Sequence, residues 1–201
     1  MQLHDAITQI SEIRSHLART ETFRGYRAAT VAGSGVLAWL GAAAQLMWLP
    51  RPVEQISGWL ALWVSIASAS LAMTAGEMWL RCRRSRSAWT VRLTRLAAEQ
   101  FLPSVAAGGL VTAVLVGAAP EALWMLPGLW AVFYGLGVFA SWRLLPRPIA
   151  WAGAYYLASG AVVLAVARNE WAFSPWAMAG TFGVGQLIIA AILYLTLERK
   201  P

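Results

Sequence analysis

The side chains that could do chemistry inside the apolar parts of this sequence are few and widely spaced. Glu77 is the only acidic residue within an apolar segment, and it stands four residues before Arg81. Gln186 lies deep in the last apolar segment, in the run Gly-Val-Gly-Gln. An ionisable group in such a place could couple transport to protons or ions, and an amide there must find a hydrogen-bond partner. The candidate polar site comprises Gln186, Tyr134, Tyr155, Tyr156 and Glu77.

Each of these residues also has a simpler structural interpretation. Glu77 and Arg81 are four residues apart, so on a helix they can form an ion pair at the boundary of the apolar segment. Gln186 and the three tyrosines can satisfy one another by hydrogen bonds between helices. We expect these structural roles ahead of ion coupling. Small residues allow helices to approach closely, and this is expected at Gly135, Gly137, Gly153, Gly160, Gly180 and Gly183.

The sequence encodes none of the familiar catalytic or cofactor sites. His4 and His16 are the only histidines and Cys82 is the only cysteine, so no set of three or four metal or haem ligands exists. No apolar segment holds a His, Lys or Asp that could activate one of its serines. A glycine-rich phosphate loop is also missing. We therefore predict no enzyme activity, no metal and no cofactor.

The densest positive charge lies between the second and third apolar segments. Residues 81–95 hold six of the sixteen Lys and Arg residues of the chain. A cluster this basic resists crossing a membrane, and it could face anionic lipid headgroups or a protein partner. The net charge of +7 does not indicate nucleic-acid binding, because the charges are confined to short gaps between apolar segments. The candidate partner or lipid-headgroup face comprises Arg81, Arg83, Arg84, Arg86, Arg92 and Arg95.

Composition indicates the kind of fold that must position these residues. The 201 residues are 59% hydrophobic and 12% charged, whereas soluble domains carry about 25% charged residues. One soluble core of this size cannot hide so much apolar mass, so lipid must cover the remainder. No segment alternates polar and apolar residues as a barrel wall must. The predicted fold class is therefore all-α, a polytopic membrane helical bundle.

Six apolar segments are near the ~20 residues needed to cross a membrane. Pro120 and Pro175 are placed as first-turn prolines of helices, and the third helix begins either near Pro103 or upstream of it. Pro127 and Gly128 predict a kink in the fourth helix. The predicted transmembrane helices cover residues 28–49, 56–80, 101–119, 122–145, 149–167 and 175–197, with a cytoplasmic basic connector at residues 81–100.

Residues 1–27 are expected to form a separate, cytoplasmic amphipathic helix. Apolar residues recur there at spacings of three and four, which places them on one helical face. The preferred interpretation is a helix that lies on the lipid headgroups. A docking or dimerisation helix is the alternative, because the spacing also fits a short heptad seam. The apolar face comprises Leu3, Ile7, Ile10, Ile13 and Leu17.

The positive residues also predict how the chain lies in the membrane. With the N-terminus inside, fourteen of the sixteen Lys and Arg residues are cytoplasmic, and only Arg51 and Arg168 are outside. Positive charge concentrates on the cytoplasmic side, so both termini are predicted to be cytoplasmic. The expected location is a plasma membrane, namely a bacterial inner membrane. Tryptophans favour membrane interfaces, and we expect Trp48, Trp59, Trp124, Trp171 and Trp176 at the outer one and Trp79, Trp89, Trp142 and Trp151 at the inner one.

Two functions remain open. The motif Leu-Pro-Arg-Pro occurs at residues 49–52 and again at 145–148, which suggests a 3+3 inverted repeat of the kind found in transporters. This repeat, six spans and the deep Gln186 favour a small-molecule permease or channel-like protein. The alternative is a non-catalytic membrane subunit or regulator. It would dock a cytoplasmic partner, or a second copy of itself, through the N-terminal helix and the basic connector. Membrane lipids are expected partners, and nucleic acid is not.

Overall fold

The computed structural model describes residues 27–84 and 88–199, and all their side chains except those of residues 88–90, 93 and 169. Within these ranges every regular element is a helix and no strand occurs, which confirms the predicted all-α class. Six helices of the described part of the chain are long and apolar enough to cross a membrane, as in a multi-pass membrane protein. They are Ala28–Trp48, Ile56–Arg84, Thr94–Ala118, Pro120–Leu144, Ile149–Val166 and Pro175–Glu198.

The second and third membrane-spanning helices, labelled α3 and α4, are longer than the sequence predicted. Helix α2 covers Ala28–Trp48, but α3 runs over Ile56–Arg84 and α4 over Ala88–Ala118. Most of the expected connector at 81–100 is therefore helical. Pro103 lies inside α4, so the upstream start, rather than a start at Pro103, is correct. The arginines mark the ends of the apolar segments, whereas the helices continue beyond those ends.

The fourth and sixth spans change helix type along their length. The 3₁₀ helix η1 (Pro120–Met125) leads directly into α5 (Leu126–Ser141), and Pro127 lies in the first turn of α5. This transition stands where a kink was predicted. The 3₁₀ helix η2 (Trp142–Leu144) and a short turn then lead into α6 (Ile149–Val166).

The last span begins after the 3₁₀ helix η3 (Asn169–Phe173). Ser174 caps its first helix, α7 (Pro175–Met178), by accepting a hydrogen bond from the backbone N–H of Trp176 at 3.3 Å. The span then continues through the π-helical segment η4 (Ala179–Gly183), α8 (Val184–Leu193) and a second π-helical segment, η5 (Tyr194–Glu198). The predicted helix starts at Pro120 and Pro175 are confirmed.

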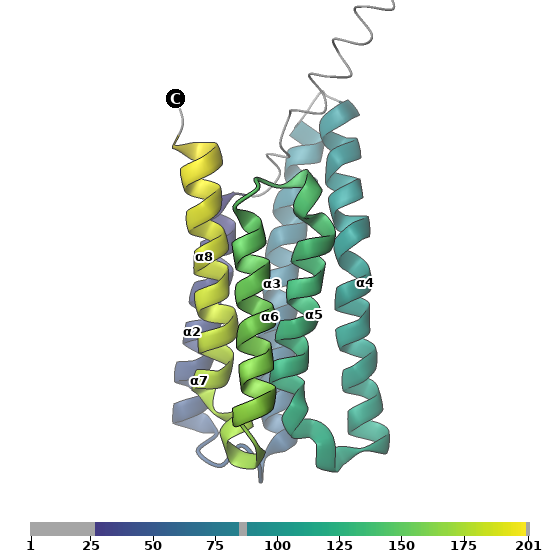
Figure 1. Ribbon diagram of the computed structural model, residues 1–201. Coiled ribbons are helices and arrows are strands. Elements are labelled where there is room, and N and C mark those ends of the chain that lie inside the picture. Colours follow the sequence, from purple (N-terminus) through teal and green to yellow (C-terminus); the bar gives the residue numbers. More distant parts are fainter. Residues whose placement is uncertain (1–26, 85–87, 200–201) are drawn as a thin grey trace, which may run out of the picture.

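The helices pack as an elongated bundle (Figure 1). Helix α5 lies between α4 and α6, and α2 packs against α3 and the last span. One apolar core, around Tyr156, Ile149 and Leu193, joins α2, α5, α6 and α8. A second, around Trp59, Trp63 and Leu126, joins α2, α3, α5 and the segment around α7. Helices α3 and α4 touch each other only weakly, and most of their surface is exposed.

Positive charge gathers at one end of the bundle. We call this the basic end; it holds the start of α2, the α3–α4 connection, the α5–α6 turn and the end of η5 (Figure 1). The opposite end, at the bottom of Figure 1, holds the α2–α3, α4–α5 and α6–α7 connections. Of the described arginines, only Arg51 and Arg168 lie there. The basic end carries Arg27, Arg81, Arg83, Arg84, Arg92, Arg95, Arg143, Arg147 and Arg199.

Six of the nine tryptophans predicted at the interfaces are exposed at the expected end; Trp124 is half-buried, and the side chain of Trp89 lies outside the described residues. Trp48, Trp171 and Trp176 are exposed at the opposite end, and Trp79, Trp142 and Trp151 are exposed at the basic end. Trp59 lies at the expected end, in the first turn of α3, but it does not face the lipid interface. Its side chain is 0% exposed and stacks on Trp130, with ring centroids 5.7 Å apart. The rotation of α3 about its axis turns Trp59 toward the other helices. The position of a residue along the helix does not indicate this direction.

Two predictions about the organisation of the chain stay predictions. The amphipathic helix expected in residues 1–27 lies outside the described residues, apart from Arg27. The two Leu-Pro-Arg-Pro turns are at opposite ends of the bundle, as an inverted repeat requires (Figure 1). Any turns separated by three antiparallel spans would have that placement, so it does not decide in favour of the repeat.

Candidate functional site

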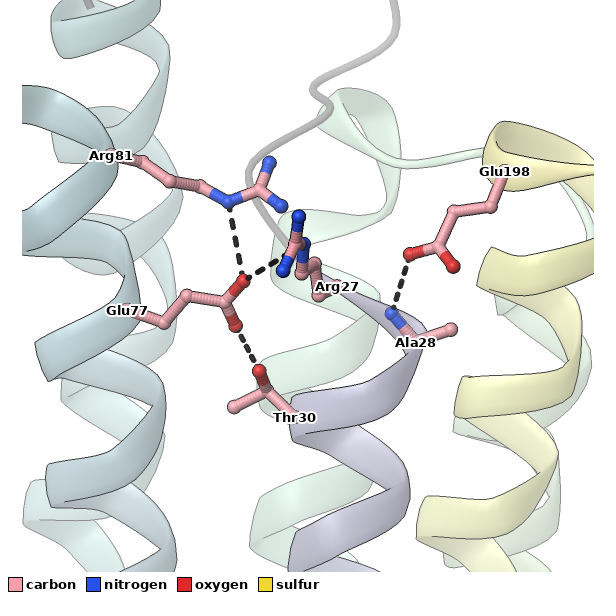
Figure 2. Close-up of polar contacts among 6 residues, drawn as sticks. All are labelled: Arg27, Ala28, Thr30, Glu77, Arg81 and Glu198. Carbon is pink, nitrogen blue, oxygen red and sulfur yellow. Dashed lines mark hydrogen bonds and ion pairs between the residues drawn. The ribbon is translucent and has the colours of Figure 1, made fainter. Parts of the chain in front are cut away.

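Glu77, the acidic residue that the sequence placed within an apolar segment, is the centre of a polar cluster (Figure 2). Its carboxylate accepts a hydrogen bond from the Arg81 side chain at 3.2 Å, and the Arg27 side chain lies 3.9 Å away. The hydroxyl of Thr30, on α2, donates to the other carboxylate oxygen. The expected ion pair with Arg81 is therefore confirmed. Through Thr30 and Arg27, Glu77 therefore links α3 to the start of α2.

A second carboxylate fixes the other side of the same helix start. Glu198, at the end of η5, accepts a hydrogen bond from the backbone N–H of Ala28 at 3.0 Å (Figure 2). The first N–H groups of a helix have no partner within the helix, and negative charge is favourable there. Arg27 precedes the helix and supplies no side-chain cap. Thus α2 begins between two carboxylates, one on α3 and one on the last span.

We expect Glu77→Gln to lower the free energy of unfolding by about 1–2 kcal/mol, since hydrogen bonds to charged groups are worth ~1.5–3 kcal/mol and the amide keeps part of them. The Glu77 side chain is only 18% exposed. Glu99→Gln is the matched control: that carboxylate pairs with Arg95 at 2.6 Å but is 52% exposed. A loss below about 0.5 kcal/mol is expected there. Reversible unfolding in mixed detergent micelles measures both, and equal losses would contradict the assigned link.

The other candidate residues form a separate cluster in the interior. The amide nitrogen of Gln186, on α8, donates to the hydroxyl of Tyr134, on α5, at 2.7 Å. Tyr134 packs on Tyr156, on α6, with ring centroids 4.6 Å apart. Phe101 and Phe182 pack edge-on against Tyr134. The structure therefore brings together Gln186, Tyr134 and Tyr156, while Glu77 takes no part in this cluster.

Tyr155 and Tyr156 point to different partners although they are adjacent. The Tyr155 hydroxyl donates to the carbonyl of Gly180, within the π-helical segment η4. The Tyr156 ring is fully buried and lies against Gly185, where a Cβ atom would overlap it. Its hydroxyl has no hydrogen-bond partner among the described residues. A buried hydroxyl without a partner is uncommon, and it makes Tyr156 the one polar group of this cluster that the described chain leaves unsatisfied.

The hydrogen bond between Gln186 and Tyr134 predicts a measurable coupling. In a double-mutant cycle with Gln186→Leu and Tyr134→Phe, we expect an interaction energy of about 0.5–1 kcal/mol, close to the average of ~0.6 kcal/mol for hydrogen bonds between membrane helices. Unfolding of the four proteins in mixed micelles gives this value. Tyr155→Phe in place of Tyr134→Phe is the control cycle, because Tyr155 bonds to Gly180. Additive effects in the first cycle would show that the bond does not contribute.

A second buried amide, Gln45, was missed in the sequence. Its side chain is 1% exposed; it accepts a hydrogen bond from the Trp63 indole at 2.9 Å and donates to the Phe173 carbonyl at 2.6 Å. It thereby joins α2, α3 and η3. The signal was present, since Gln45 interrupts an uncharged apolar run. Because Gln45 lies near the end of that run, it resembled a residue at the membrane surface. Gln186, in contrast, lies near the middle of its apolar segment.

The arginines of the proposed lipid or partner face extend along two helix ends. Arg83 lies over the Trp79 ring at 3.9 Å from its centroid, and Arg95 pairs with Glu99 one turn on. Arg84 and Arg92 are exposed. Arg86 lies outside the described residues. Arg81 is the member that turns inward, toward Glu77 (Figure 2).

The arrangement offers few groups for catalysis. Among the described residues, no three His, Cys, Asp or Glu side chains gather as metal ligands would. The two buried amides and Tyr134 are held by hydrogen bonds, and the carboxylate of Glu77 is held by Arg81 and Thr30. These groups hold neighbouring helices together. To contact a solute, each would first have to give up its present hydrogen bond or ion pair.

Comparison with known proteins yields no relative. No protein-family model matches the chain, no curated protein is similar to it, and no solved structure matches it. Function must therefore be argued from the residues themselves.

Proposed function

We propose that this chain is a non-catalytic membrane subunit or regulator, whose cytoplasmic basic end docks a partner protein. The observation that carries the proposal is that both buried amides already have hydrogen-bond partners within the chain. Gln45 and Gln186 are both bonded to neighbouring side chains and packed among apolar residues. A permease needs polar groups that face its solute at mid-depth. Here Gln186, the amide at mid-depth, is bonded to Tyr134. Gln45, three residues before the end of α2, is bonded to Trp63 and to the Phe173 carbonyl.

The distribution of charge supports the same proposal. Nine described arginines lie at the basic end, and most of their side chains are exposed. By the positive-inside rule this end faces the cytoplasm, in a bacterial inner membrane on our proposal. The N-terminal amphipathic segment predicted in residues 1–27 would join it there. Arginine is well suited to pairing with carboxylates on a partner surface.

Site-specific photo-crosslinking in living cells tests the proposal. A photoreactive amino acid at Arg84 or Glu99, which are exposed near the basic end, should give a discrete protein adduct. The same group at Glu121 or Glu170, exposed at the opposite end, should not give that adduct. Replacing Arg83, Arg84, Arg92 and Arg95 with Gln should reduce the adduct severalfold. No adduct at either basic-end position, or the same adduct at both ends, would contradict docking at the basic end.

A permease is the second candidate, and one observation favours it. The π-helical segment η4 lies beside the Gln186 cluster, and Tyr155 bonds to its Gly180 carbonyl. Single π turns often occur at functional sites, and the unsatisfied Tyr156 hydroxyl lies close by. Solute release from liposomes containing the purified chain separates the two candidates. Release above that of empty liposomes, abolished by Gln186→Leu, would support the permease and contradict the first proposal.

A further inference from the structure

The turn between α5 and α6 forms a small cavity at the basic end, apart from the arginine face at the α3–α4 connection. It has a volume of about 220 Å³ and is lined by Trp142, Arg143, Leu145 and Arg147. Two cationic side chains therefore share one hollow with two apolar ones. Small-molecule sites usually enclose about 300–1,000 Å³. This cavity is smaller, so it fits a charged group of a few heavy atoms.

The two guanidinium groups supply the binding capacity of the cavity. Neither Arg143 nor Arg147 pairs with a carboxylate of any described residue. The backbone N–H groups at the start of α6 are already used. Those of Ile149, Ala150 and Trp151 donate to the carbonyls of the residues three positions before them, at 2.9–3.2 Å. An anion here would therefore be held by arginine side chains, which bind phosphate with paired N–H donors.

The turn that presents these arginines is firmly anchored. Pro146, which stands between them in the sequence, is buried. Ile149, which begins α6, is 1% exposed and belongs to the core around Tyr156. The arginine side chains themselves are exposed. Since the backbone is fixed by packing, less order has to be imposed when a ligand binds.

The surroundings indicate which anion would arrive. Trp142 and Trp151 are exposed at this end of two membrane-spanning helices, which is the usual level of lipid headgroups. Leu145 and Trp142 give the cavity an apolar wall. No acidic side chain lines it, so the ammonium group of a zwitterionic lipid would find no carboxylate. The chemistry matches a phosphodiester that carries net negative charge and is attached to an apolar tail.

We propose that this cavity is a binding site for the phosphodiester headgroup of an anionic phospholipid. Arg143 and Arg147 hold the phosphate oxygens, and Trp142 and Leu145 contact the glycerol and the first part of the acyl chains. The site is distinct from the arginine face at the α3–α4 connection. It does not depend on whether the chain docks a partner or transports a solute.

Native mass spectrometry of the full-length protein in detergent tests this site. Phosphatidylglycerol and phosphatidylcholine are titrated separately, and the first-bound lipid is quantified. The wild-type protein should bind phosphatidylglycerol more tightly. The double variant Arg143→Gln, Arg147→Gln should weaken that binding about tenfold, which corresponds to ~1.4 kcal/mol. The control variant Arg27→Gln, Arg199→Gln removes the same charge at the same end, from residues outside both the cavity and the arginine face at the α3–α4 connection. It should change the affinity less than twofold.

Three results would overturn the proposal. One is equal weakening by both double variants, which would indicate general attraction to the basic end. Another is equal wild-type affinity for the two lipids. The third is displacement of bound phosphatidylglycerol by millimolar inorganic phosphate, which would indicate a site for a free anion. Thermal stability of the lipid-free variants, compared with the wild type, keeps a folding defect separate from a binding defect.

Discussion

Replacing Gly160 with alanine should lower the free energy of unfolding by about 2 kcal/mol, within the ~1–3 kcal/mol typical of overpacking. Gly160, on α6, faces Gly128, on α5. A Cβ atom at Gly160 would lie 2.8 Å from the Gly128 carbonyl oxygen and 3.0 Å from the Val132 backbone nitrogen. These are backbone atoms that cannot turn aside, so the two helices must separate. Gly160→Leu should cause a larger loss than Gly160→Ala.

The control for this prediction lies on the neighbouring helix α4. A Cβ atom at Gly117 would meet no atom within 4 Å. Gly117→Ala should therefore leave stability unchanged or raise it, since alanine favours helix by up to ~1 kcal/mol over glycine. Both variants are compared by reversible unfolding in mixed micelles and by thermal unfolding in detergent. If Gly160→Ala were as stable as Gly117→Ala, the close contact between α5 and α6 would be refuted.

Replacing Gln45 with leucine should destabilise the protein by about 2–4 kcal/mol, because two buried groups lose their partner at ~1–3 kcal/mol each. The Trp63 indole N–H and the Phe173 carbonyl would both be left in an apolar core. Leucine is of similar volume, so the loss reflects hydrogen bonding more than packing.

Two further variants make the interpretation of Gln45→Leu specific. Gln100→Leu, at an exposed position of α4, should change stability by less than about 0.5 kcal/mol. Trp63→Phe removes the indole donor, so adding it to Gln45→Leu should cost less than the sum of the two single changes. Full additivity of Gln45→Leu and Trp63→Phe would mean that the bond between these residues contributes nothing.

The positions of the membrane-spanning segments could be predicted, because a helix that crosses lipid must be apolar and about 20 residues long. All six spans were found in the sequence, since each needs an uninterrupted apolar run of about 20 residues. The ends of α3 and α4 were misplaced for the same reason. Hydropathy reports where the lipid ends, whereas a helix can continue into the headgroup region or water. Arg83, Arg84 and Arg95 are exposed residues of helices that extend in this way.

Side-chain partners were predictable only where spacing along one helix decides them. Glu77 and Arg81 are one turn apart, and their ion pair was expected. Which residues meet between helices depends on how each helix is rotated, and a uniformly apolar span gives little indication of that. The burial of Trp59 and the bonds of Gln45 were therefore missed.

The glycines show both outcomes. Gly135, Gly153 and Gly160 do lie at close helix contacts, and so do Gly137 and Gly183, whereas Gly180 faces open space and its predicted packing role is wrong. Gly128 and Gly135 on α5, and Gly153 and Gly160 on α6, are each seven residues apart. Two turns of helix place each pair on one face. That spacing could have identified α5 and α6 as a closely packed pair.

We propose that the apolar helices span the membrane and that the basic end lies in the cytoplasm. Cysteine labelling on intact bacterial cells tests it most directly, in a Cys82→Ser background with single cysteines at Arg84 or Glu121. A membrane-impermeant maleimide should label the cysteine at 121 in intact cells, and the cysteine at 84 only after the membrane is opened. Labelling at 84 and not at 121 in intact cells, or recovery of the protein in solution without detergent, would contradict the claim.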